Sequence, residues 1–263
     1  LRDLDDGTRG HHEPRRARPR DNTECSMSAK RPVLGILGGM GPLSSAEFLC
    51  TLYECAADGR AEQDMPLALL LSDPTFPLRT ADPRSASWGA LRDRIEAGLQ
   101  HLIGCGCDEI VLCCFTAHHV VPELSATSAG RLRSLLDATL AELQAATGPC
   151  LVLCSTATRR LGLLEAHTSW PAVRARCTFP DDADQVRVNR MILEVKSRGA
   201  STALATELDA LVAQYGVENA VFACTELHML NRAIEKLRLA TAYQRRDPLY
   251  SLARAVCARM PQS

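Results

Sequence analysis

The sequence has no long hydrophobic run. Although 46% of its 263 residues are hydrophobic, no apolar stretch reaches roughly 18 residues, the length that a membrane-spanning helix needs. No apolar segment typical of a signal peptide follows the N-terminus. We therefore expect a cytoplasmic protein without membrane contact, long enough for one large or two small domains.

An excess of charge and the spacing of a zinc site are also missing. The formal net charge is −1 and the isoelectric point is near 6.7, which gives no sign of a nucleic-acid surface. The 12 cysteines never form paired Cys-x-x-Cys knuckles. In a cytosolic setting such cysteines stay reduced. We expect neither a metal site nor a nucleic-acid partner.

Short apolar runs alternate with amphipathic segments from residue 33 onward. The runs at residues 33–37, 67–71, 110–114, 150–154 and 220–224 are typical of strands that are buried on both faces. The segments between them repeat apolar residues mostly at helical spacing. Because strands that alternate with helices build parallel sheets, the predicted fold class is α/β.

The pattern occurs twice along the chain, which predicts two pseudo-symmetric parallel-sheet domains with a shared cleft between them. The first domain is expected to comprise residues 31–128 together with about 245–263, and the second about 129–244. Residues 1–30 show no hydrophobic periodicity and are expected to be a disordered tail. Met27 begins a stretch typical of a translation start, so we expect the tail to be an artefact of translation from a point upstream of the usual start.

Cysteines end two of the predicted strands. Cys114 and Cys224 each close an apolar run and are each followed by a small polar stretch. In open α/β sheets the chemistry lies where strands end and helices begin. The alternative is that both are core cysteines, since free cysteine is among the most buried residue types. The repeated context favours a two-sided acid/base site in which each domain contributes one thiol.

Two loops could hold an anion. A glycine-rich turn, residues 38–42, joins the first strand to a helix, and its amides favour a carboxylate. The turn lacks the spacing of a dinucleotide fingerprint and of a Walker motif, and turn geometry without a ligand is the alternative. Arg79 lies in a second loop, rich in proline, where its planar fork could bind a carboxylate or remain a solvated charge.

Several motifs occur together in the order of one known family. The chain resembles the aspartate/glutamate racemase superfamily, and the aspartate racemase branch most closely, over nearly all of residues 31–263. The motifs that carry the resemblance are Ile36-Leu37-Gly38-Gly39-Met40-Gly41-Pro42, Glu62-Gln63-Asp64, Pro77-Leu78-Arg79-Thr80, Cys114-Phe115-Thr116-Ala117-His118, Asp184-Gln185 and Cys224-Thr225-Glu226.

The resemblance implies racemisation without a cofactor, with Cys114 and Cys224 as the two catalytic thiols. His118 and Glu226 would tune or orient these thiols, or would only begin helices. Relatives that resemble this chain form dimers, so a homodimer is expected. The substrate-binding residues implied by the motif match are Gly39, Met40, Gly41, Arg79, Phe115, Thr116 and Thr225.

The chain departs from the family pattern at three points. Phe115 replaces an asparagine that helps to bind the amino-acid head group, and Leu78 replaces an aspartate. The family also has a lysine on the helix before the second half-site. An ungapped comparison puts Ser197 there, with Lys196 one residue earlier, so no role is assigned to either residue.

The sequence therefore predicts a cofactor-independent amino-acid racemase acting on a small carboxylic or amino acid. One thiolate would remove the α-proton, and the opposite thiol would return a proton to the planar carbanion. The alternatives are a decarboxylase or isomerase of the same fold acting on a modified or less polar acid, a cysteine-nucleophile hydrolase, and a catalytically altered binding homologue.

Overall fold

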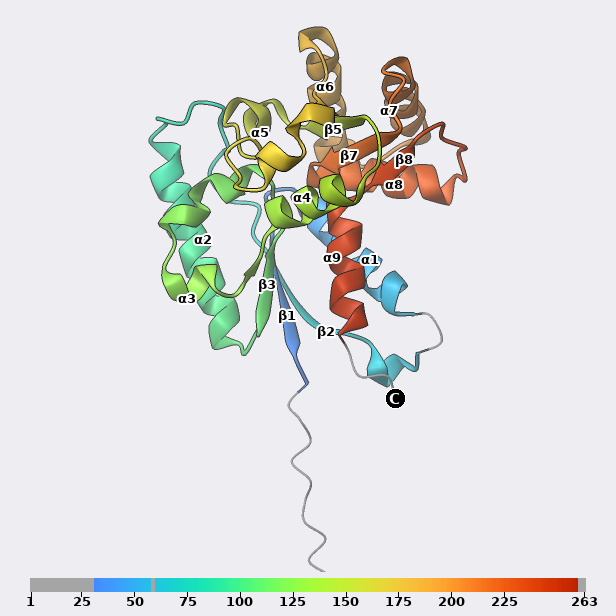
Figure 1. Ribbon diagram of the computed structural model, residues 1–263. Coiled ribbons are helices and arrows are strands. Elements are labelled where there is room, and N and C mark those ends of the chain that lie inside the picture. The colour runs from blue at the N-terminus through green and yellow to red at the C-terminus, as the bar shows by residue number, and fades with distance from the viewer. Residues whose placement is uncertain (1–30, 58–59, 260–263) are drawn as a thin grey trace, which may run out of the picture. The chain divides into compact units, whose positions relative to one another are not determined.

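Two four-stranded parallel sheets organise the chain in the computed structural model, which describes residues 31–57 and 60–259 (Figure 1). The predicted tail, residues 1–30, lies outside the described residues, as do residues 260–263 of the predicted first domain. No helix in the described part of the chain is both long and apolar enough to cross a membrane.

The two sheets have the same topology. The first has the order β2-β1-β3-β4 and the second the order β6-β5-β7-β8, and every strand pair is parallel. The predicted α/β class with parallel sheets is therefore confirmed. The strands are β1 (Val33–Gly38), β2 (Leu67–Ser72), β3 (Glu109–Leu112), β4 (Leu132–Arg133), β5 (Cys150–Cys154), β6 (Cys177–Thr178), β7 (Asn219–Ala223) and β8 (Gln244–Arg246).

Helices follow most strands, as the alternating pattern predicts. The α-helices are α1 (Pro42–Ala56), α2 (Ser87–Gly104), α3 (Ala126–Ala129), α4 (Leu135–Ala145), α5 (Thr156–Arg160), α6 (Asp182–Arg198), α7 (Thr202–Gln214), α8 (Thr225–Lys236) and α9 (Pro248–Ala258). The short 3₁₀ helices are η1 (Glu62–Asp64), η2 (Thr116–Glu123), η3 (Trp170–Ala172) and η4 (Arg174–Arg176).

Central strands are buried on both faces, which explains their continuous apolar runs. In β1, Leu34 and Ile36 pack on the side of α1 and α9, while Leu37 packs on the side of α2. In β7, Val221 likewise faces one cluster and Phe222 the other. This alternation follows from the two-residue period of a strand.

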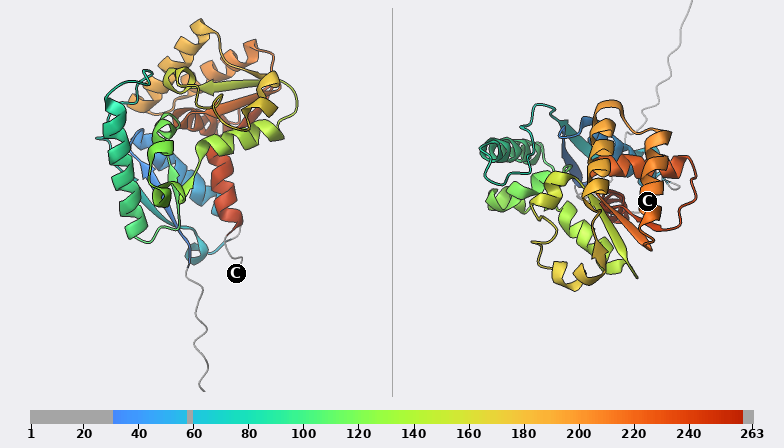
Figure 2. Two further views of the ribbon diagram at one scale, coloured as in Figure 1. Left: turned by 60° about the vertical axis from the view of Figure 1, so that its left-hand side comes forward. Right: turned by 90° about the horizontal axis from the view of Figure 1, so that it is seen from above.

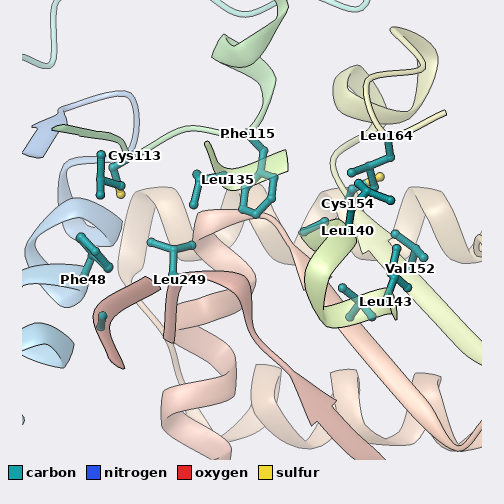
Figure 3. Packing of buried hydrophobic residues seen from close by; sticks show 14 of the residues in the cluster. Phe48, Cys113, Phe115, Leu135, Leu140, Leu143, Val152, Cys154, Leu164 and Leu249 are labelled. Carbon is teal, nitrogen blue, oxygen red and sulfur yellow. The ribbon is translucent and has the colours of Figure 1, made fainter. Parts of the chain in front are cut away.

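A hydrophobic core joins the two sheets. The cluster shown in Figure 3 combines residues of both sheets with residues of α1, α4 and α9. Helix α9 packs against α1 and α4, and Figures 1 and 2 show it beside α1. Because residues from Arg31 onward form one compact unit, the predicted division into domains near residues 129 and 245 stays a prediction.

Candidate active site

Both cysteines at strand ends lie on the wall of one cavity of about 370 Å³. Cys114 follows β3 of the first sheet, and Cys224 follows β7 of the second. Two loops therefore bring thiols from distant parts of the sequence to the same space. Another cavity, of about 220 Å³, opens beside Val33 and Glu109 at the opposite strand ends, and no cysteine lines it.

Cys114 is almost buried, with 7% of its surface exposed. Its carbonyl oxygen accepts a hydrogen bond from Nδ1 of His118 at 2.9 Å. Since Nε2 of His118 accepts from the backbone amide of Leu135 at 3.1 Å, the ring carries its proton on Nδ1 and is neutral. Burial lowers the pKa of His118, which agrees with a neutral ring. The histidine thus contacts the backbone of Cys114 rather than its sulfur.

Cys224 has a carboxylate partner. Its Sγ donates a hydrogen bond to Oε2 of Glu226 at 3.1 Å, and the hydroxyl of Thr225 donates to the same oxygen at 3.1 Å. Burial, and next the negative charge of Glu226, raise the pKa of the Cys224 thiol well above its ordinary value. Cys224 is therefore a protonated thiol at neutral pH, already bonded to a proton acceptor.

Glu226 lies between helix α6 of the second half of the chain and the glycine-rich turn of the first half. Its side chain is nearly buried, and Oε1 lies 3.6 Å from Nζ of Lys196 on α6. The same oxygen lies against the glycine-rich turn, because a Cβ atom added to Gly41 would be only 2.4 Å from it. A side chain at position 41 would therefore displace the carboxylate of Glu226 from this contact.

Arg79 holds the glycine-rich turn from a neighbouring loop. Its Nη2 donates to the carbonyl of Met40 at 2.5 Å, and its Nη1 donates to the carbonyl of Pro77 at 3.0 Å. Arg79 also lines the cavity, whereas Gly39, Met40 and Gly41 do not. The arginine thus reaches the cavity, while the turn supports it and makes room for Glu226.

Three hydroxyl groups join the halves beside Cys114. The Oγ1 atom of Thr116 lies 2.8 Å from that of Thr158 and 3.2 Å from Oγ of Ser155. Ser155 and Thr158 are also 3.0 Å apart through their hydroxyls. Thr116 and Ser155 line the cavity, and Thr225 lines it near Cys224. These groups form a polar wall that can bind an acid.

Phe115 belongs to the wall and to the core at once. It lines the cavity, but only 2% of its surface is exposed. Figure 3 shows its ring beside Leu135 within the core cluster. The substitution of asparagine by phenylalanine therefore removes a polar group from the cavity wall and adds an aromatic ring to the core.

The sequence analysis assigned no role to the two polar residues of α6 that line the cavity, Asn189 and Lys196. Ser197, which the ungapped comparison suggested, is exposed and donates to the carbonyl of Glu194 instead. The signal that identifies Lys196 is helical periodicity, because it lies seven positions after Asn189 and therefore on the same face. No group of three or more potential metal ligands occurs among the described residues.

Fold and site together define an α/β protein with two like sheets and a cavity that two thiols share. The chain belongs to the Asp/Glu/Hydantoin racemase family, whose family model matches residues 37–244. This confirms the predicted superfamily. Family membership makes the protein a racemase-type enzyme, that is, an isomerase.

Solved structures of racemases share the fold. An aspartate racemase from Picrophilus torridus is 21% identical, with a TM-score of 0.71 over 88% of this chain and 96% of that one. An aspartate racemase homologue from Pyrococcus horikoshii is 16% identical, with a TM-score of 0.62 over 87% and 100%. A glutamate racemase from Campylobacter jejuni is 15% identical, with a TM-score of 0.55 over 86% and 85%.

Proposed function

We propose that this protein is a cofactor-independent amino-acid racemase of the aspartate/glutamate type, in which Cys114 and Cys224 act on opposite faces of an α-carbon. The observation that carries the proposal is the meeting of both thiols on one cavity whose wall also contains the cations Arg79 and Lys196. A homodimer and a cytoplasmic location remain expectations from the resemblance and the composition.

The cations account for binding of the substrate. The amino acid presents a carboxylate, and Arg79 and Lys196 supply positive charge at the cavity wall. Removal of the α-proton spreads negative charge from the α-carbon into this carboxylate. Charges already fixed in place stabilise the carbanion without the cost of reorganising water.

The thiols account for proton transfer. In one direction the Cys224 thiolate takes the α-proton, the C–H electron pair stays on the carbon, and the Cys114 thiol returns its own proton to the other face. The opposite direction exchanges the two roles. Glu226 accepts the thiol proton of Cys224, to which it is already hydrogen-bonded, and so prepares the thiolate.

Exchange of the α-proton with solvent tests the proposal directly. Both enantiomers of aspartate and of glutamate are incubated with the enzyme in D₂O, and loss of the α-proton signal is followed by NMR. The wild type should exchange and racemise at least one of these acids. Absence of exchange from all four would overturn the proposal.

Single substitutions then test the two-thiol mechanism. Cys114→Ser and Cys224→Ser should each lower racemisation by about 10²- to 10⁴-fold, because a hydroxyl is a far weaker acid than a thiol. Each variant should still exchange the proton of one enantiomer, and the two variants should prefer opposite enantiomers. Cys257→Ser is the matched control, since Cys257 is as buried as Cys224 but does not line the cavity. Full turnover by either test variant would show that one thiol suffices.

A further inference from the structure

One face of α6 forms a wall of the cavity. Asn189, Ile192, Leu193 and Lys196 all line it, at the three-, four- and seven-residue spacing that places side chains on the same helix face. The two polar residues are therefore separated by two turns, with apolar side chains between them. This wall comes from the second half of the chain, as does Cys224.

The structure fixes the orientation of the Asn189 side-chain amide. Its Oδ1 accepts a hydrogen bond from the backbone amide of Thr156 at 3.3 Å, and Thr156 also lines the cavity. The planar amide group then has its two N–H donors on Nδ2 directed away from that bond. Nδ2 donates to no partner among the described residues.

Apart from the first thiol, the side-chain donors that the first half of the chain contributes to the cavity wall are already engaged. Arg79 donates to the carbonyls of Met40 and Pro77, and the hydroxyl of Thr116 contacts two other hydroxyls. Phe115 has no side-chain donor, and its ring is in the core. A donor without a protein partner on a cavity wall fits a ligand that brings an acceptor oxygen.

We propose that Asn189 is a substrate-binding residue whose Nδ2 donates a hydrogen bond to a carboxylate oxygen of the bound acid. Lys196 on the same helix face is paired with Glu226, but Arg79 also lines the cavity, so positive charge exceeds negative charge on its wall and favours an anionic acceptor over an amino group. The assignment of the acid as a substrate rests on the proposed function, whereas binding of a carboxylate does not.

Two substitutions separate this role from mere support of the Thr156 amide. Asn189→Asp keeps an acceptor for the Thr156 N–H but replaces the cavity donor with a negative charge. Asn189→Ala removes both the donor and the acceptor without adding charge. Gln214→Glu is the matched control, because it makes the same amide-to-acid change at an exposed position of the neighbouring helix α7.

The affinity for succinate and for malonate is measured by calorimetric titration of each purified variant, together with kcat and KM for the amino acid that exchanges fastest. Asn189→Ala should weaken binding about 10-fold or more, and Asn189→Asp about 100-fold or more, because a lost hydrogen bond is joined by charge repulsion. KM should rise in parallel, and Gln214→Glu should match the wild type.

Three results would overturn the assignment. If Asn189→Asp binds both acids as well as the wild type while Asn189→Ala does not, the residue only supports Thr156. If all variants bind succinate and malonate with the affinity of the wild type, Nδ2 of Asn189 contacts no carboxylate. If the wild type binds neither acid, the cavity is not a carboxylate site. A wild type that binds these acids but exchanges no α-proton would refute the proposed racemase and leave the role of Asn189 to be decided by the affinities alone.

Discussion

The two thiols occupy equivalent positions in two like halves, yet their surroundings differ. Cys114 follows β3, the third strand of the first sheet along the chain, and Cys224 follows β7, the third strand of the second sheet. The Cys224 thiol is bonded to a buried carboxylate, whereas Sγ of Cys114 has no hydrogen-bond partner among the described residues. The shared topology sets the positions of the two thiols, whereas the neighbouring side chains determine whether a thiol has a hydrogen-bond partner.

The histidine four residues after each cysteine shows the same contrast. His118 is neutral and is hydrogen-bonded to the backbone of Cys114 and of Leu135. His228 is fully buried, with Nδ1 2.7 Å from Oδ2 of Asp247 and Nε2 3.0 Å from Oγ1 of Thr51. Burial raises the pKa of Asp247, but the charge and hydrogen bond of His228 lower it overall. The second histidine therefore connects α8 to α1 and to the start of α9.

The residue directly after each cysteine also differs. Thr225 donates its hydroxyl proton to Glu226, so that position belongs to the polar network of Cys224. Phe115 places its ring in the core between the two sheets. The position after the cysteine therefore belongs to the active-site network in the second half and to the hydrophobic core in the first.

The largest effect expected from this contrast is on stability. Phe115→Asn should lower the free energy of unfolding by about 3–5 kcal/mol, because it removes a buried ring and places an amide among apolar neighbours. Urea unfolding of the variant measures this loss, and Phe115→Leu, which stays apolar, should lose less. A stable asparagine variant with higher activity on aspartate would show instead that position 115 acts mainly through the cavity.

Glu226→Gln tests the difference between the thiols themselves. Glutamine keeps the shape that fits against Gly41 but cannot accept the Cys224 proton as a carboxylate does. Exchange of the enantiomer on which Cys224 acts should fall about 100-fold. Solvent exchange by NMR measures this for each enantiomer, and Glu235→Gln on the same helix is the control. An equal and small loss for both enantiomers would contradict a specific link between Glu226 and Cys224.

Much of the fold could be predicted from the sequence because buried strands are visible as apolar runs. The run that ends in Cys114 and the run that ends in Cys224 both became strands followed by helical turns. Strand β4 was missed, since Leu132–Arg133 is too short to show a period, and helix α4 begins only after it, at Leu135. Ser134 caps it by accepting from the amide of Asp137.

The details of the site depend on contacts that no local pattern contains. The fit of Glu226 against Gly41 joins residues from opposite halves. The face of α6 that carries Lys196 depends on the exact rotation of a helix, so an ungapped comparison that is shifted by one residue selects Ser197 on another face. Phe115 lines the cavity and also packs in the core, a double role that the sequence does not show.

The smallest effect is on the pH dependence of each thiol taken alone. In Cys114→Ser only Cys224 can remove a proton, and it must first become a thiolate. Because burial and Glu226 raise its pKa above the ordinary value of 9.0, the thiolate fraction should increase about tenfold per pH unit from neutral pH and keep rising past pH 9. Adding Glu226→Gln removes the charge that helps to raise this pKa, so the rise should shift to lower pH, although every rate stays below that of Cys114→Ser because the carboxylate that accepts the thiol proton is gone. The rate of α-proton exchange between pH 6 and pH 10 measures both profiles, with Cys224→Ser reporting on Cys114 under the same conditions. A plateau reached well below pH 9 in Cys114→Ser would mean that substrate binding overcomes the burial of Cys224, and that the two thiols differ less in the complex than in the free enzyme.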